Sequence, residues 1–173
     1  MNQAYRNMRA FWLDARNLEN RKGMLEIGPE KIVGAGVEMA LADGTARKHL
    51  LIATNSLGDS SLYFENNSKS GLGGMIGGHG NEPLQTAAAH LLAHASKLTD
   101  QMIKLPAGAN LPAPSAAGQV CLFALSKENL FYKEMAETEA RNPANPFYPM
   151  FAYSQQVIGL FKTQDEKTPP AHA

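Results

Sequence analysis

The sequence predicts an α+β fold in which helices pack against one mainly antiparallel sheet. Segments near the start, middle and end of the chain repeat their apolar residues every three to four positions, as amphipathic helices do. The segments between them alternate every second residue, as half-buried strands do. The predicted order is helix, three strands, glycine-rich loop, helix, two strands, helix. Because the strands come in hairpins, an antiparallel sheet with helices packed on it is expected.

The N-terminal segment predicts the first helix. Its apolar residues recur at three- and four-residue steps from Met1 through Tyr5, Met8 and Trp12, which places them on one helical face. Gly23 fits a helix C-cap, since glycine tolerates the left-handed backbone found there. The helix is therefore expected to run to about this glycine.

Three strands are expected next, joined by tight turns. Residues 37–41 alternate apolar and small side chains, and residues 48–54 return as a second strand after the turn sequence Asp43-Gly44. Residues 61–65, with the sequence SLYFE, form the third strand. The three runs together predict a meander that ends at the glycine-rich segment.

A second helix and a second hairpin follow that segment. Residues 84–102 carry an apolar stripe, with Asn81 as the N-cap and Pro83 in the first turn. Residues 120–125 and 130–135 then read as two strands joined across the sequence SKEN. These elements supply the rest of the sheet and its main helical cover.

The sequence PFYPMFAYSQQVIGLF near the end predicts a last helix whose apolar face is wider than one sheet would cover. A contact between subunits would explain the extra width, and burial by the N-terminal helix is the alternative. The candidate interface residues are Phe147, Phe151, Tyr153 and Leu160.

The composition is that of one soluble globular domain, with 44% hydrophobic and 18% charged residues. Residues 1–162 are expected to form this domain, with an extended connection over 105–118 and a polar flexible tail over 163–173. Sixteen basic and sixteen acidic residues give no net charge, which argues against nucleic acid as a partner. No apolar run approaches the roughly 18 residues of a membrane span, so no membrane contact is expected.

The cysteine content points to a reducing compartment. Cys121 is the single cysteine, so no internal disulfide can form. The first 17 residues lack the apolar core and the cleavage site of a secretory signal peptide. We therefore expect a cytoplasmic protein, with Cys121 as a small buried residue of a strand rather than a nucleophile.

Residues 71–80, GLGGMIGGHG, hold six of the fifteen glycines and lead into a helix N-terminus, which is the setting of a phosphate cradle. The spacing of the glycines does not match a dinucleotide-binding fingerprint, and the segment lacks the end of a P-loop sequence. No lysine or arginine lies between Lys69 and Lys97 to neutralise a phosphate. The favoured interpretation is structural, with glycines that allow close packing and with Met75 and Ile76 facing the core. A small-ligand contact is the alternative, through Gly73, Gly74, Gly77, Gly78, His79 and Asn81.

His90 and His94 are spaced i, i+4, so both rings leave one helical face and could hold one metal ion. His79 lies roughly 15 Å from His90 along the helix axis, so it cannot easily bind the same ion. Two ligands alone bind weakly, so surface histidines are the preferred interpretation. No cofactor, metal site or catalytic residue is predicted.

Two resemblances accompany these patterns. The element order resembles that of profilin-like and roadblock-like domains, and also that of type III secretion chaperones. The run SLYFENNSKSGLGGMIGGHGNEPLQTAAAHLLAHA, with PFYPMFAYSQQVIGLF near the end, resembles an uncharacterised group of bacterial proteins. That group implies a bacterial, cytoplasmic, single-domain protein, and it implies no activity.

The leading functional hypothesis is a small, non-catalytic binding or interaction module that associates with itself as a homodimer or other homo-oligomer. The second hypothesis is an enzyme or sensor that holds a small ligand at residues 71–80. The third is a chaperone that docks a protein partner, which rests on element order alone.

Overall fold

The computed structural model describes residues 1–14, 17, 31–44, 46–66, 71–78 and 80–165. Seven strands form one antiparallel sheet in the order β4-β3-β2-β1-β6-β7-β5. The strands are β1 (Gly34–Asp43), β2 (Ala46–Asn55), β3 (Ser60–Glu65), β4 (Leu72–Gly77), β5 (Ile103–Pro106), β6 (Gln119–Leu125) and β7 (Asn129–Ala136). The sheet is open, with β4 at one edge and β5 at the other.

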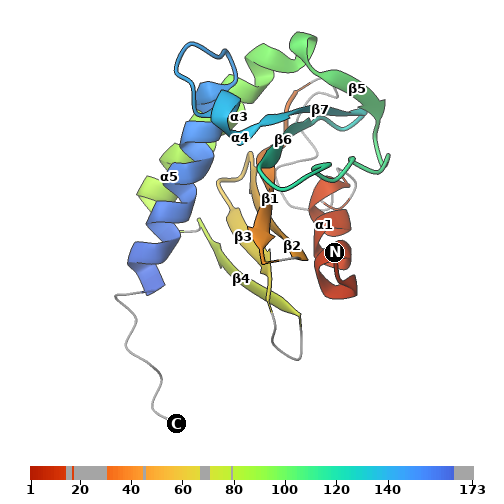
Figure 1. The fold of residues 1–173 in the computed structure, drawn as a ribbon. Coiled ribbons are helices and arrows are strands. Elements are labelled where there is room, and N and C mark those ends of the chain that lie inside the picture. Colours follow the sequence, from red (N-terminus) through yellow and green to blue (C-terminus); the bar gives the residue numbers. More distant parts are fainter. Residues whose placement is uncertain (15–16, 18–30, 45, 67–70, 79, 166–173) are drawn as a thin grey trace.

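Four α-helices lie within the described residues: α1 (Gln3–Leu13), α3 (Glu82–Leu98), α4 (Glu137–Ala140) and α5 (Tyr148–Asp165). A 3-10 turn, η1 (Thr99–Gln101), follows α3. Helices α3 and α5 cover one face of the sheet, and α1 covers the other (Figure 1). The predicted α+β class, with helices packed on an antiparallel sheet in a single domain, is confirmed.

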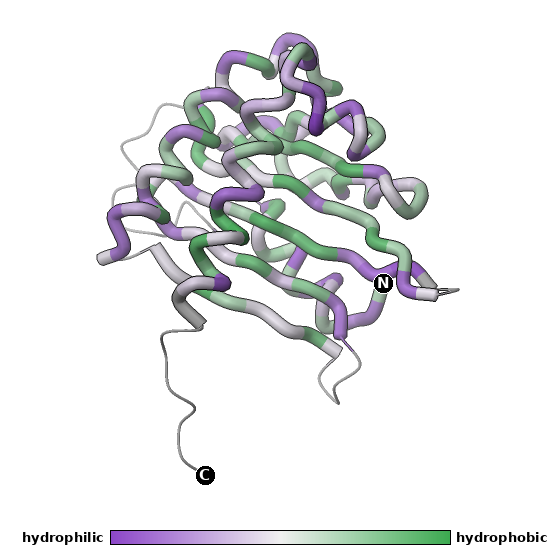
Figure 2. The backbone as a smooth tube through the Cα atoms, turned by 60° about the vertical axis from the view of Figure 1, so that its left-hand side comes forward, coloured by the Kyte–Doolittle hydropathy of each residue, from purple (hydrophilic) through white to green (hydrophobic). Residues whose placement is uncertain are grey.

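The sheet separates two apolar cores because alternate side chains of each strand point to opposite faces. The core under α3 and α5 takes residues such as Val37, Ile52 and Leu122 from the central strands. The core under α1 takes residues such as Leu51 and Phe123 from the same strands. Figure 2 shows these strands as hydrophobic stretches lying beneath the helices.

Both predicted hairpins are present. Gly44 adopts a φ of 57° at the turn between β1 and β2, a backbone conformation that favours glycine. The second hairpin pairs Leu125 with Leu130 across the SKEN turn. Local turn chemistry and two-residue alternation were sufficient signals for these four strands.

Helix α1 buries Tyr5 and Trp12, as its apolar spacing predicts, but it ends at Leu13. Asp14 is already extended, with φ −100° and ψ 105°. The predicted end of this helix near Gly23 lies outside the described residues.

Helix α3 is shorter than the predicted 84–102, because the chain leaves the α-helix at Leu98 and passes through η1. Residues 103–106 then pair with β7 as a short strand, so the connection expected over 105–118 begins inside the sheet. Buried Met102 continues the apolar stripe of α3 without being helical, since its contact is with the core at the end of the helix.

At the C-terminus, α5 continues to Asp165, three residues into the segment expected to be a flexible tail. The last eight residues, 166–173, lie outside the described residues. No helix in the described part of the chain is both long and apolar enough to cross a membrane.

Candidate functional site

The glycine-rich segment is mainly an edge strand, and its prediction as a loop is wrong. Residues Leu72–Gly77 pair with β3 in continuous antiparallel register, from Glu65 opposite Leu72 to Ser60 opposite Gly77. The sequence signal for this strand was weak because glycine is usually depleted in strands and supplies no alternating side chains.

Aromatic side chains of β3 explain two of the glycines. A Cβ at Gly73 would lie 2.4 Å from the ring of Phe64, its partner across the two strands. A Cβ at Gly74 would lie 2.7 Å from the ring of Tyr63 and 2.9 Å from the carbonyl oxygen of Leu62. The rings therefore lie over the glycines of β4 and supply the packing that the glycines lack.

Two further glycines permit close approach at the end of β4. A Cβ at Gly77 would lie 3.0 Å from the ring of Phe161 on α5 and 3.1 Å from Leu84 on α3. Gly78 adopts a φ of 118°, and a Cβ there would lie 2.2 Å from the carbonyl oxygen of Gly58. Glycine is required at Gly78 on both counts.

Met75 and Ile76 do not share the environment predicted for them. Met75 is half-buried and packs against the core under α3 and α5. Ile76 points to the opposite face of the sheet, and 74% of its surface is exposed. The expectation that both residues face the core is wrong for Ile76, since neighbouring residues of a strand point to opposite faces.

At the N-terminus of α3, two of the N–H groups that could hold an anion already have partners. The Asn81 side chain accepts a hydrogen bond from the Leu84 N–H at 3.1 Å, and the Gly78 carbonyl accepts one from the Asn81 N–H. Asn81 is therefore the predicted N-cap. His79 lies outside the described residues, and a ligand site at residues 71–80 stays a prediction.

The backbone pairing decides which groups β4 presents to its open side. The Asn66 N–H donates to the Gly71 carbonyl, so hydrogen-bonded pairs continue at every second position along β3 and β4. Gly73, Met75 and Gly77 consequently direct their N–H and C=O groups at β3. Gly74 and Ile76 direct theirs away from it, toward the open edge.

The other edge presents different residues. The Ala107 N–H donates to the Glu128 carbonyl, so the same alternation turns the backbone of Lys104 and Pro106 away from β7. Proline has no N–H to offer, and an edge lysine discourages a second strand from pairing. The lysine also lies over the Phe131 ring, with its Nζ 5.9 Å from the ring centroid.

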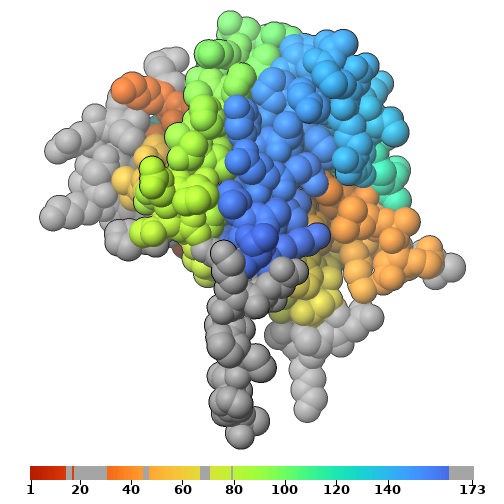
Figure 3. Space-filling view, turned by 90° about the vertical axis from the view of Figure 1, so that its left-hand side faces the viewer, coloured from red at the N-terminus to blue at the C-terminus, as the bar shows by residue number. Residues whose placement is uncertain are grey.

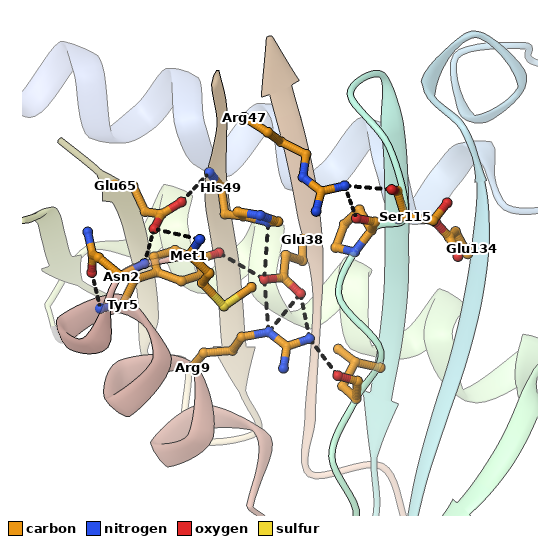
Figure 4. Close-up of polar contacts among 12 residues, drawn as sticks. Met1, Asn2, Tyr5, Arg9, Glu38, Arg47, His49, Glu65, Ser115 and Glu134 are labelled. Atoms are coloured by element: carbon orange, nitrogen blue, oxygen red, sulfur yellow. Dashed lines mark hydrogen bonds and ion pairs between the residues drawn. The ribbon is translucent and has the colours of Figure 1, made fainter. Parts of the chain in front are cut away.

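A buried polar cluster attaches α1 to the sheet (Figure 4). Glu38, fully buried in the middle of β1, accepts hydrogen bonds from the Arg9 Nε at 2.8 and 2.9 Å and from the Tyr5 hydroxyl at 3.1 Å. Arg9 also donates to the Leu111 carbonyl, which ties the 108–113 connection to the same cluster. The carboxylate thus has a cation and a neutral donor as partners, which a buried charge requires.

His49 borders this cluster, with its Nδ1 3.9 Å from a Glu38 oxygen and without a hydrogen-bond partner among the described residues. Burial lowers the pKa of His49 below its ordinary value of 6.5, and the nearby carboxylates of Glu38 and Glu65 oppose that shift. Burial together with Glu38 raises the pKa of Tyr5 far above its ordinary value. Both groups are therefore neutral near pH 7.

A cleft of about 550 Å³ lies between α1 and the 108–113 connection. Arg6, Arg9 and Asn110 contribute polar groups to its wall, and the Arg9 guanidinium is held in place by Glu38. None of the five predicted ligand residues that the structure describes lines it. The sequence patterns did not predict the cluster or the cleft. The one local sign of them was a single glutamate, Glu38, in the otherwise apolar strand sequence GAGVEMALA.

His90 and His94 both meet Tyr153 of α5. The rings of His90 and Tyr153 stack at 4.9 Å with an 11° interplanar angle, and those of His94 and Tyr153 at 5.5 Å and 25°. No group of three or more metal-ligating side chains occurs among the described residues. Burial, aided by Lys97, lowers the pKa of His94.

The predicted interface residues on α5 divide into two groups. Phe147 and Phe151 are buried in the core, with 4% and 2% of their surface exposed. Tyr153 and Leu160 are half-buried and pack against the core under α3 and α5, two helices that lie side by side (Figure 3). A subunit contact at α5 stays a prediction, and it would use only the second pair without rearrangement.

Cys121 is buried as predicted, and burial raises the pKa of its thiol, so the thiolate of a nucleophile is disfavoured.

Comparisons of the chain with models of known protein families, with curated proteins and with solved structures find no match. The resemblances in element order and in the SLYF and glycine pattern therefore stay predictions.

Proposed function

We propose that this protein is a small, non-catalytic interaction module of the cytoplasm that associates with itself through the open edge of strand β4. The observation that carries the proposal is an edge strand whose described residues include neither the charge nor the proline that commonly protect such an edge. From Gly71 to Gly78 the chain has no charge and no proline, and exposed Ile76 projects from this strand.

Strand addition is a general mode of protein recognition in which main-chain hydrogen bonds supply affinity and alternate side chains supply specificity. Gly74 and Ile76 offer N–H and C=O groups in the orientation that an added strand needs. The aromatic rings over Gly73 and Gly74 keep β4 extended without placing side chains in the way.

The test is sedimentation velocity or light scattering over about 1 to 500 μM protein, a range that covers weak association. We expect a concentration-dependent increase in mass. Ile76→Lys should weaken the association at least about tenfold, because it removes an apolar contact and brings like charges together. Ile76→Pro should do the same by removing an outward N–H while leaving the pairing with β3 intact.

Ile103→Lys is the matched control, since Ile103 is also an exposed isoleucine, 54% exposed, on the protected edge β5. It should leave the association unchanged. A strict monomer at all concentrations, or equal effects of the two lysine variants, would contradict the proposal. Loss of association in Leu160→Lys alone would place the contact on α5 instead.

A further inference from the structure

Resting on the proposed function, the geometry of β4 points to a second copy of the same strand as its partner, paired antiparallel about a twofold axis at Met75. In this register Gly74 of each copy lies opposite Ile76 of the other. The inference therefore fixes both the partner and the alignment of the two chains.

The pattern of outward-facing groups supports this alignment. Gly74 and Ile76 are two residues apart, and both direct N–H and C=O groups at the open edge. A hydrogen-bonded antiparallel pair exchanges two N–H···O bonds, so pairing Gly74 with the partner's Ile76 forms two, and the twofold axis repeats them. The register thus uses the outward groups of both residues in four hydrogen bonds.

Side-chain shape also favours a second copy. Ile76 and Gly74 lie on the same face of the strand, so one copy provides a projecting side chain beside a position with none. The twofold axis sets each Ile76 against the partner's Gly74, and next to the Tyr63 ring that covers this glycine. An isologous interface requires this kind of self-complementary surface.

Charge is consistent with self-pairing. The strand and its flanks from Gly71 to Gly78 hold no charged residue, so two copies meet there without like-charge repulsion. A single pair of six-residue strands buries far less than the roughly 1,600 Å² of a standard stable interface. The dimer is therefore expected to be weak and to depend on protein concentration.

Cysteine cross-linking tests the register. Met75 would lie opposite its own copy in a non-hydrogen-bonded pair, with Cα atoms about 4.5 Å apart, which is within disulfide range. The two Ile76 Cα atoms would be about 8 Å apart, beyond that range. We expect oxidised Met75→Cys to form a disulfide-linked dimer and Ile76→Cys to form several-fold less.

Wild-type protein is the background control, because its one cysteine, Cys121, is buried. Both variants are also measured under reducing conditions, where sedimentation reports association without the disulfide. Association that persists without a Met75→Cys cross-link, or with a stronger Ile76→Cys cross-link, overturns the register and leaves the proposed function standing. A wild-type protein that stays monomeric overturns the proposed function itself.

Discussion

Strands β4 and β5 form the two edges of one sheet, yet they present opposite chemistry to an approaching strand. β5 has four residues and turns Lys104 and Pro106 outward, whereas β4 has six residues and turns Gly74 and Ile76 outward. A lysine and a proline at outward positions are standard protection against edge-to-edge pairing. We therefore expect the β5 edge to resist pairing with a second strand and the β4 edge to accept it.

The contrast is informative because both edges belong to the same molecule and share the same solvent. Neither edge lacks exposed apolar surface, since Ile76 and Ile103 are both exposed. What separates them is the kind of residue at the outward-facing positions, which are Gly74 and Ile76 on β4 but Lys104 and Pro106 on β5. Hydrophobicity alone would not have distinguished the two strands.

The largest expected effect concerns the glycine that holds the end of β4 in place. Gly78→Ala should destabilise the fold by about 3 kcal/mol, since it combines a left-handed φ with a methyl group placed on the Gly58 carbonyl. Gly80→Ala is the matched control. Its φ is also positive, but its Cβ would meet nothing within 4 Å, so about 1 kcal/mol is expected. Denaturant unfolding measures both, and equal losses would show that close packing at Gly78 is unimportant.

The next largest effect is expected when the lysine and the proline that protect β5 are replaced. The double variant Lys104→Thr with Pro106→Val restores an outward N–H and removes the charge, so β5 should also accept a strand. A molecule with two open edges can add copies at both, and we expect assemblies larger than a dimer in light scattering. Combining it with Ile76→Lys should limit growth to pairs. If the double variant forms assemblies of no greater mass than wild type at equal concentration, the lysine and the proline are not what prevents pairing at β5.

The smallest effect is a change in stability with pH, and it arises under α1, away from both edges. Burial lowers the pKa of His49 in the folded protein, so the unfolded chain binds the proton more readily. The free energy of unfolding is therefore fully retained above pH 6.5, the ordinary pKa of histidine, and it decreases as the pH falls below that value. Thermal unfolding between about pH 8 and pH 5 should show a weaker pH dependence in His49→Leu than in wild type. Equal slopes would rule out His49 as the titrating group.

The amino-acid sequence determined most elements because their signals are local. Asp43-Gly44 between two alternating runs predicts a hairpin wherever the chain lies, and Asn81 before an apolar stripe predicts the start of a helix. The α+β class follows from these patterns. The end of α3 was less predictable, because the apolar residue Met102 continues the stripe after the backbone has stopped being helical.

Only the tertiary structure decided that residues 72–77 form an edge strand. Glycine has no side chain to reveal a period of two, and the packing that stabilises β4 comes from Tyr63 and Phe64 on the neighbouring strand. The outward direction of Gly74 and Ile76 likewise depends on the register with β3. The partners of Glu38 are 29 and 33 residues away in the chain, a separation that local patterns do not report. Local periodicity thus determined the elements, and contacts between distant residues decided the edge, the buried cluster and the candidate site.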